Sequence, residues 1–358
     1  MTATEPTATP VRPSAGERGW RKLTLALLAF LVLPTLPDLR AFLPIDQTIY
    51  LLVPALAACF LVGWWAGGRA WLALAWVALA GWMMWQRNVV PNGFHNLERG
   101  WSLLLAGSFG LVCLFGERRP LFARALGALA MAFFLGWAIS AVGQVPLTDA
   151  RETVAAEFLR RNTETMNKIN GAIAQHPTEW KDLTSRLPAF AEIPAQMEQD
   201  LKDRARQGLA LFPAMLALES LFAMALAWSI YHRLSRARIG APMRPLREFR
   251  FNDQLVWGLI VGLTIAFLPT MQGLRGFGRN VLVFFYALYA LRGFGVLAWY
   301  LAPGALLAAL TVGFAVSQVP GIPLQFAGIK LLMLAIFILG LFDTWADWRR
   351  RVRPSADH

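Results

Sequence analysis

The sequence predicts an all-α fold, a polytopic bundle of about 8–10 transmembrane helices with a small helical loop outside the membrane. Three observations lead to this prediction. Hydrophobic residues make up 56% of the 358 residues and charged residues only 16%, which is more apolar surface than a soluble chain can bury. Apolar runs near the roughly 20 residues that cross a bilayer recur along the chain. Basic residues gather in short segments between these runs, as membrane topology requires.

The first 22 residues, rich in Thr, Pro and Ala, predict a disordered cytoplasmic tail before a signal-anchor helix. The N-terminal transmembrane group, 23–143, contains predicted spans at 23–43, 49–66, 70–86, 101–116 and 121–143. A C-terminal bundle, 209–348, contains spans at 209–231, 254–272, 280–302, 304–319 and 325–344, and residues 349–358 form a second cytoplasmic tail. Pro34 and Pro37 interrupt the first run, and Pro-Gly joints connect the last three, so broken or re-entrant helices are expected there.

Charge orients this model, because Lys and Arg are enriched in cytoplasmic loops. With the N-terminus inside, cytoplasmic segments hold the basic residues of the tail, of 118–124, of 232–254 and of the C-terminus. The short outer loops carry only Arg40, Arg87, Arg99, Arg275 and Arg279. We therefore predict a bacterial cytoplasmic (inner) membrane protein with both termini in the cytoplasm. Enrichment of basic residues in cytoplasmic loops explains the net charge of +12. The lipid bilayer is therefore the expected partner, and nucleic acid is not.

Residues 144–208 form a long polar segment that the orientation places outside the membrane. The spacing of Val154, Phe158 and Leu159 indicates amphipathic helices, punctuated by Pro177 and Pro188. The segment fits either a cap over the bundle or a solvated helical connector.

Three motifs carry a family resemblance: YHRLSRARIGAPMRPLREFRF at 231–251, GRNVLVFFYALYALRGFGVL at 278–297 and LGLFDTWADWRRR at 339–351. On these motifs the chain from Pro213 onward resembles the YybS-like family of uncharacterised bacterial multi-pass membrane proteins, a family of unknown function. That family is grouped by similarity with the substrate-binding membrane subunits of energy-coupling-factor transporters. The resemblance implies a membrane protein of unassigned activity, although this chain has more predicted helices than those subunits.

Two ionisable residues lie near the middle of predicted spans, Glu219 in 209–231 and Arg292 in 280–302. Such groups cost roughly 2.5–3.5 kcal/mol at the bilayer centre, so they are candidates for a functional site. An ion pair between them would bind a small polar solute or gate a cavity; a buried structural pair is the alternative. Gly293 and Gly295 flank Arg292 and suit close helix approach or local unwinding, with packing the simpler use.

Asn280 stands at the outer mouth of the predicted 280–302 helix, where the family it resembles has a recurrent Asn. An N-cap is the alternative and the favoured role, because Asn is among the best capping residues. Glu219, Arg292, Asn280, Gly293 and Gly295 together form the predicted substrate-binding set.

The basic segment between 232 and 254 is a candidate for cytoplasmic interaction with anionic lipid or a protein partner. Asp343, beside Trp345 near the C-terminus, is expected in an interfacial belt and is a candidate for a salt bridge to this segment. The predicted cytoplasmic interaction set is Arg233, Arg236, Arg238, Arg247 and Asp343.

Enzymatic signatures are missing from the sequence, so we predict no cofactor, no metal and no catalytic centre. The four His residues lack metal-ligand spacing, and no P-loop, GxSxG or dinucleotide fingerprint occurs. His95 and Glu98 fit a turn after Asn92 better than a catalytic group. Cys59 and Cys113 lie in apolar runs and are expected as small core residues. Two functions remain: a transporter-type component that binds a small polar solute, or a non-catalytic scaffold that holds protein partners.

Overall fold

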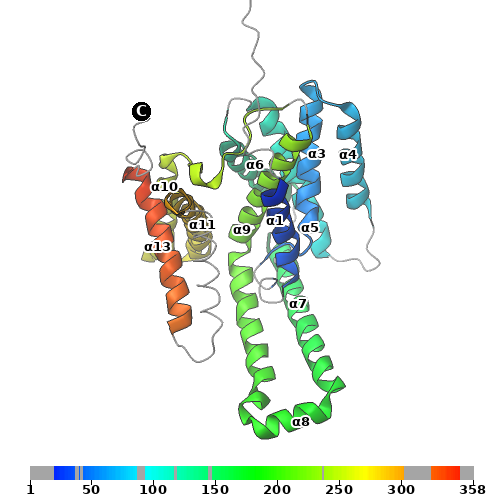
Figure 1. Cartoon of the computed structure of the whole chain (residues 1–358), viewed down its shortest axis with the longest axis vertical. Helices are drawn as coiled ribbons and strands as arrows, with labels where there is room; N and C mark the ends of the chain where they lie inside the picture. Colours follow the sequence, from blue (N-terminus) through cyan, green and yellow to red (C-terminus); the bar gives the residue numbers. More distant parts are fainter. Residues whose placement is uncertain are drawn as a thin grey trace, which may run out of the picture.

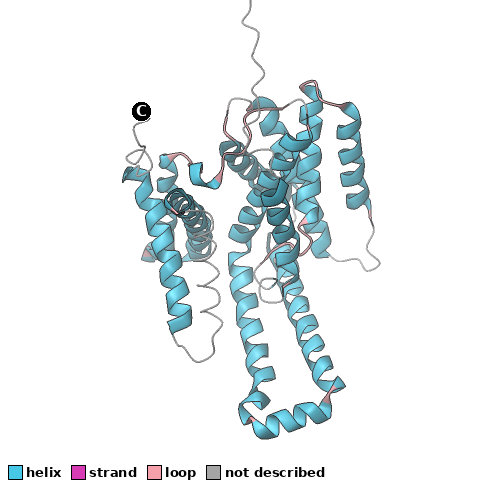
Figure 2. Ribbon diagram, viewed as in Figure 1, coloured by secondary structure: helices cyan, strands magenta, loops and turns pink. Residues whose placement is uncertain are grey.

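A computed structural model of the chain describes residues 20–36, 40, 43–86, 93–116, 119–143, 147–235, 238–301 and 324–346. Side chains are not described for Leu147, Ala189 and residues 324–330. Within these ranges every regular element is a helix, which confirms the all-α prediction (Figures 1 and 2). The predicted tails, the predicted span 304–319 and its Pro-Gly joints lie outside the described residues, apart from the first helical residues Trp20 to Lys22.

The N-terminal group begins with α1 (Trp20–Val32) and the 3₁₀ turn η2 (Leu33–Thr35). Pro34 lies in this turn, and because proline supplies no backbone N–H, the helix ends before it. The remaining members are α3 (Ile49–Trp65), α4 (Ala70–Trp85), α5 (Gly93–Phe115) and α6 (Leu121–Val142). Three of these begin where the apolar runs begin, but α5 starts eight residues before the predicted 101.

The polar segment forms a helical arm that projects away from the bundle instead of folding over it (Figure 1). It consists of α7 (Leu147–Gln175), α8 (Pro177–Arg186), the 3₁₀ turn η3 (Pro188–Glu192) and the first sixteen residues of α9 (Ile193–Leu234). We call residues 147–208 the outer arm, where "outer" denotes the side that charge predicts to be extracytoplasmic. The 42 residues of α9 are one helix that continues from the arm into the bundle, about 63 Å at 1.5 Å per residue.

The C-terminal part contains two 3₁₀ turns, η4 (Leu246–Glu248) and η5 (Asp253–Leu255), before α10 (Val256–Phe267). A further 3₁₀ segment, η6 (Pro269–Leu274), leads into α11 (Arg275–Tyr300), and α13 (Leu324–Ala346) follows later in the chain. Helix α11 packs against α9, α10 and α13, so it connects the C-terminal helices to the rest of the bundle.

The core of the bundle lies around α9, which packs against α1, α3, α6 and α11. Trp228, Tyr231 and Met224 of α9 are among the largest fully buried side chains. Large apolar side chains on the outward faces of the helices are exposed instead, including Leu25, Trp71, Trp82, Leu103, Trp137 and Trp257. An apolar exterior around an apolar core is the surface that contacts lipid.

Four described helices are long and apolar enough to cross a membrane: Gly93–Phe115, Leu121–Val142, Phe190–Leu234 and Pro269–Tyr300. Shorter apolar helices lie at Ile49–Trp65, Ala70–Trp85, Asp253–Phe267 and Leu331–Ala346. A 17-residue helix such as α3 is at the lower limit for spanning, about 25 Å long.

Candidate functional site

Arg161 joins the outer arm to the bundle. Its side chain is 3% exposed, and its guanidinium donates to the main-chain oxygens of Leu43 at 3.0 Å and Pro44 at 3.2 Å. It also pairs with Asp46 at 2.9 Å and with Glu157 at 3.0 Å. All three guanidinium nitrogens are thus used, and they hold α7 against the segment that precedes α3.

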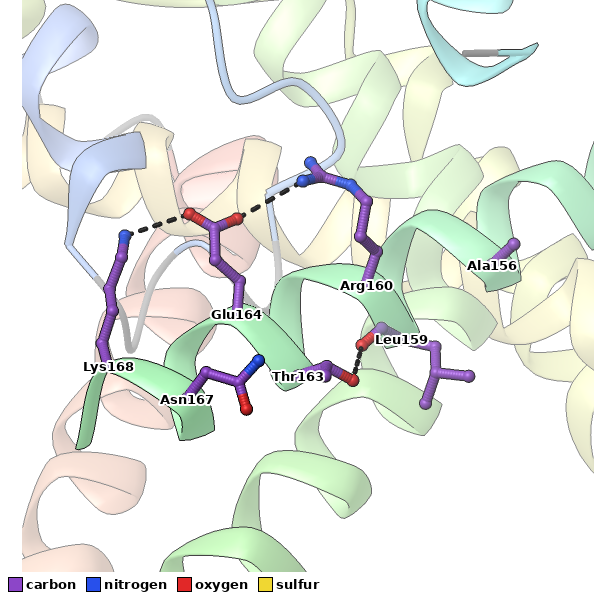
Figure 3. A pocket seen from close by; sticks show the side chains of 7 residues that line it. All are labelled: Ala156, Leu159, Arg160, Thr163, Glu164, Asn167 and Lys168. Atoms are coloured by element: carbon purple, nitrogen blue, oxygen red, sulfur yellow. Dashed lines mark hydrogen bonds and ion pairs between the residues drawn. The ribbon is translucent and has the colours of Figure 1, made fainter. Parts of the chain in front are cut away.

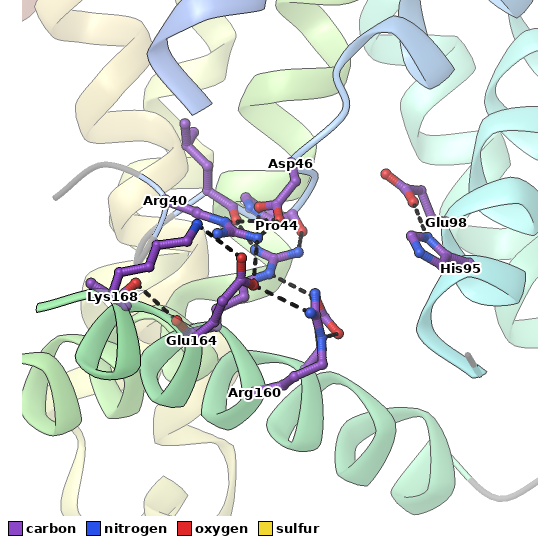
Figure 4. A network of polar contacts seen from close by, with 12 residues as sticks. Arg40, Pro44, Asp46, His95, Glu98, Arg160, Glu164 and Lys168 are labelled. Carbon is purple, nitrogen blue, oxygen red and sulfur yellow. Dashed lines mark hydrogen bonds and ion pairs between the residues drawn. The ribbon is translucent and has the colours of Figure 1, made fainter. Parts of the chain in front are cut away.

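Further ion pairs lie around this junction (Figure 4). Glu164 is at their centre, with Lys168 at 3.0 Å, Arg160 at 3.4 Å and Arg40 at 3.6 Å. The hydrogen bond from Lys168, with the charges of Arg40 and Arg160, lowers the pKa of Glu164 below its usual value of 4.5. We call Arg40, Asp46, Glu157, Arg160, Arg161, Glu164 and Lys168 the junction network.

A surface pocket opens beside this network along one face of α7 (Figure 3). Its charged lining residues are Arg160, Glu164 and Lys168, and Figure 3 shows them paired with one another. Both cations are already paired with Glu164, so the pocket offers no unpaired carboxylate to a cationic ligand.

Two buried carboxylates lie on the membrane side of the junction, and we call Glu98 and Glu219 the carboxylate pair. Glu219, on α9, is 6% exposed and accepts a hydrogen bond from the backbone N–H of Ile45 at 3.2 Å through Oε2. Glu98, on α5, is 5% exposed and its Oε2 lies 3.1 Å from Nδ1 of His95. Among the described residues, the Oε1 atom of each has no hydrogen-bond partner.

The carboxylate pair shares one electrostatic environment. Glu98, Arg161 and Asp46 all act on the charge of Glu219, and Arg161 and Asp46 act also on Glu98. Close to the pair, Trp101 of α5 donates its indole N–H to the hydroxyl of Ser220 on α9 at 2.9 Å. Among the deeply buried charged residues of this region, the carboxylates Glu98, Glu157 and Glu219 outnumber the one guanidinium, Arg161.

The predicted ion pair between Glu219 and Arg292 is wrong. Arg292 pairs instead with Asp343 at 2.9 Å and with Asp253 at 2.9 Å. Asp253 begins η5, the turn that leads into α10, and Asp343 lies near the end of α13, so Arg292 lies where the approach to α10 and the end of α13 meet. Glu219 contacts Ile45 and faces the arm junction.

Arg292 connects three elements. Its Nε and Nη2 donate to the carboxylate and the main-chain oxygen of Asp343, and its Nη1 donates to Asp253. The guanidinium also lies 5.3 Å from the ring centroid of Phe251. Arg292 is 3% exposed and Asp343 1% exposed. Because each nitrogen is used and Asp343 is buried, Arg292 is a structural connection, and the expectation of Asp343 in an interfacial belt stays a prediction.

Gly293 serves the close approach of α11 and α13. A methyl group there would overlap the main-chain oxygen of Ile336, and one at Gly340 would overlap that of Tyr289. Gly295 is buried in the same helix. The packing role considered for Gly293 therefore agrees with the structure, and α11 is continuous and not unwound at this point.

Asn280 does not cap a helix, because α11 begins five residues earlier at Arg275. Its side-chain oxygen accepts from the N–H of Ala214 at 2.9 Å, and its amide donates to the oxygen of Ala210 at 2.8 Å. These are the two groups that bond to each other in a regular helix. Asn280 bonds to both groups beside Pro213, and so connects α11 to this turn of α9.

The cytoplasmic interaction set is dispersed. Arg233 is half-buried, donates to the main-chain oxygen of Ser229 at 2.9 Å and lies over Trp20. Arg238 and Arg247 are exposed on the segment before α10, and Arg236 lies outside the described residues. The predicted salt bridge from Asp343 to this segment stays a prediction.

The sequence reasoning missed His95, Glu98, Asp46, Glu157 and Arg161 as parts of one site. A signal for the first two was present, since His95 and Glu98 are three residues apart and share a face if the helix already begins at Gly93. In the described part of the chain, no group of three or more His, Cys, Asp or Glu side chains is arranged to hold a metal ion. Cys59 and Cys113 are buried free thiols.

Long apolar helices, a lipid-facing apolar surface and a charged arm together define a polytopic helical membrane protein. The chain belongs to the family described as "Predicted membrane protein (DUF2232)", whose model matches residues 95–344. This match includes the carboxylate pair, the arm, Arg292 and Asp343, and it confirms the resemblance to an uncharacterised membrane family. Similarity to energy-coupling-factor subunits stays a prediction. No curated protein and no solved structure matches the chain.

Proposed function

We propose that this protein is a transporter-type membrane component that binds a small, positively charged solute at the outer end of its helix bundle. The observation that carries the proposal is the carboxylate pair, Glu98 and Glu219, buried with one oxygen of each unpartnered among the described residues.

The chemistry of the ligand follows from the charge of this site. A buried carboxylate is costly unless it is paired or hydrogen-bonded. Arg161 is already held by Asp46, Glu157 and two main-chain oxygens, so it does not satisfy the two free oxygens. An ammonium or guanidinium group carries both the charge and the several N–H donors that two carboxylates accept.

Binding is tested by thermal unfolding of the purified full chain in nanodiscs with a panel of primary amines, diamines, guanidinium compounds and quaternary ammonium compounds. Neutral and anionic compounds of similar size serve as ligand controls. A binding cation stabilises the folded state by about 2.7 kcal/mol at about 100 times its Kd. We expect Glu98→Gln and Glu219→Gln to abolish the stabilisation.

Glu198→Gln is the matched control, because Glu198 is an exposed arm residue paired with Lys202. It should retain the full response. The proposal is contradicted if no organic cation stabilises the protein, or if both glutamine variants respond as the unchanged protein does.

A scaffold function is the second candidate, and exposed apolar residues on the arm favour it. Leu183, Leu187, Ile193 and Met197 are 37%, 51%, 39% and 43% exposed, and they lie around the end of the arm that is remote from the bundle (Figure 1). A photo-crosslinking residue in place of Leu187, with one in place of Asn167 as the control, tests this function in native membranes. A stoichiometric protein adduct specific to the Leu187 position supports a scaffold, and its absence argues against one.

A further inference from the structure

We infer that the carboxylate pair holds one exchangeable proton, which reaches it from the outer aqueous phase through His95 and leaves by the same route when a cation binds. The cation-exchange part of this inference rests on the proposed function, whereas the proton site itself does not.

The charged groups around the pair leave it without a permanent counter-ion. From α7, Arg161 and Glu157 contact each other, and from the segment before α3, Asp46 contacts Arg161. Arg161 influences both members of the pair at a distance, but its hydrogen bonds and ion pairs go to other groups. Helices α5 and α9 carry the pair themselves. Among their described residues, the one side chain in direct contact with the pair is His95 of α5, which contacts Glu98. A proton is the smallest cation that satisfies one of the free oxygens.

His95 has the position that proton entry requires. Its side chain is 28% exposed, whereas that of Glu98 is 3% exposed, so the imidazole reaches solvent and also contacts the buried carboxylate, which it faces in Figure 4. Nδ1 faces Oε2 of Glu98 at 3.1 Å. Imidazole changes its charge near neutral pH and has two distinct nitrogens. Water gives a proton to Nε2, the Nδ1 proton passes to Glu98, and neutral imidazole is restored.

Exchange with the solute conserves charge. When a monovalent organic cation enters, the carboxylate pair releases one proton to His95, and His95 releases it to the outer solution. The site therefore keeps the same net charge with a proton bound or with a monovalent cation bound. The consequence is that protons and cationic solutes compete for one site.

The proton is detected in the unmodified full chain with dicyclohexylcarbodiimide. This reagent takes up both the proton and the carboxylate oxygen of a protonated acid in an apolar site, and the resulting acylurea is located by mass spectrometry. We expect adducts at Glu98 or Glu219, falling about tenfold per pH unit once the proton is lost. Glu164, which is half-buried and held by ion pairs, and the exposed Asp182 are internal controls and should stay unlabelled. His95→Phe should slow the exchange of the proton with solvent.

Methylammonium is the probe for competition. We expect it to protect the pair from the carbodiimide and to release about one proton per bound cation in weakly buffered solution. Absence of adducts on Glu98 and Glu219 from about pH 5 to about pH 9 overturns the proton site. If adducts form but no cation in the panel binds, the proton site stands and the proposed function fails. If cations bind without adducts or proton release, the proposed function stands and this inference fails.

Discussion

At the scale of single residues, Arg161 carries the attachment of the arm. It connects α7 to Leu43, Pro44 and Asp46, and its guanidinium lies 5.1 Å from the ring centroid of Phe94 on α5. A buried guanidinium cannot be removed without leaving its acceptors unpaired. The long side chain of Arg161 thus contributes both charge and packing.

Arg161→Met should therefore lower the free energy of unfolding by about 3–5 kcal/mol, because Asp46 and Glu157 lose a buried partner. Thermal unfolding in nanodiscs measures the change. Arg186→Met is the matched control, since the exposed pair of Arg186 with Asp182 on the same arm is worth at most about 1 kcal/mol. Equal effects of the two substitutions would show that Arg161 does not stabilise the attachment of the arm to the bundle.

Glu164 gives the junction network a dependence on pH. Its pKa is lower in the folded protein than its usual 4.5, first because of the hydrogen bond from Lys168. Its contribution to stability is present above the unfolded-state pKa and is lost as the pH falls through the lower folded-state pKa. We expect the Tm difference between the protein and Glu164→Gln to exist at neutral pH and to vanish once the pH falls below the folded-state pKa of Glu164, which is itself lower than 4.5. A difference that stays constant across this range contradicts the interpretation.

The sequence predicts which residues are buried charged groups, but it does not predict which residues they contact. Glu219 is recognisable from the sequence as a charge within an apolar run, yet its hydrogen bond comes from the backbone of Ile45, 174 residues away. Hydropathy estimates how deep a residue lies, but not which way it points around its helix. Arg292 was for that reason assigned to Glu219, when Asp253 and Asp343 are its partners.

At the scale of elements, some helices are longer than the apolar runs from which they are predicted. Hydropathy detects the part of a helix in lipid, and it does not detect a polar continuation. Helix α9 extends sixteen residues before the predicted start at 209, and α5 includes the polar turn with His95 and Glu98. The end of α1 was predictable, because Pro34 interrupts a helix by its chemistry alone.

Asn280 should stabilise the contact of α9 with α11 by replacing the backbone bond between Ala210 and Ala214. We expect Asn280→Ala to cost about 1–3 kcal/mol, since it removes partners from polar groups in an apolar setting. In a Pro213→Ala background the turn can close, so the same substitution should cost less. Asn167→Ala, on an exposed position of α7, is the control. Additive losses in the double-mutant cycle would argue against this role.

Gly293 should tolerate no side chain, because α13 passes directly over it. Gly293→Ala is expected to cost about 1–3 kcal/mol or more through overpacking. Gly276→Ala on the same helix is the control, because a methyl group there meets no neighbour within 4 Å. Thermal unfolding of the two variants separates a local clash from a general effect of alanine in α11.

At the scale of the whole molecule, composition was enough for the fold class. The balance of apolar and charged residues predicts a helical membrane protein, as the structure and the family show. The projecting arm was not predictable, because its helices are amphipathic in a way that suits both a cap and an extended hairpin. The position of the arm is fixed by contacts such as those of Arg161, which join residues more than 100 positions apart in the sequence.

The orientation of the whole molecule in the membrane is tested by cysteine labelling. Leu187→Cys on the arm should react with a membrane-impermeant maleimide on intact cells, and Arg247→Cys only after the membrane is opened. The native Cys59 and Cys113 are each 1% exposed and provide a low background. The reverse labelling pattern would invert the topology and place the carboxylate pair on the cytoplasmic side.

The unbroken course of α9 has a mechanical consequence. One rod of about 63 Å carries the arm at one end, Glu219 within the bundle, and the basic segment at the other end. Pro213 lies between the arm and Glu219, in the turn that Asn280 contacts, and is the point at which such a rod bends most easily. A displacement of the arm tip would therefore bend α9 between the outer arm and Glu219, because one helix connects the two.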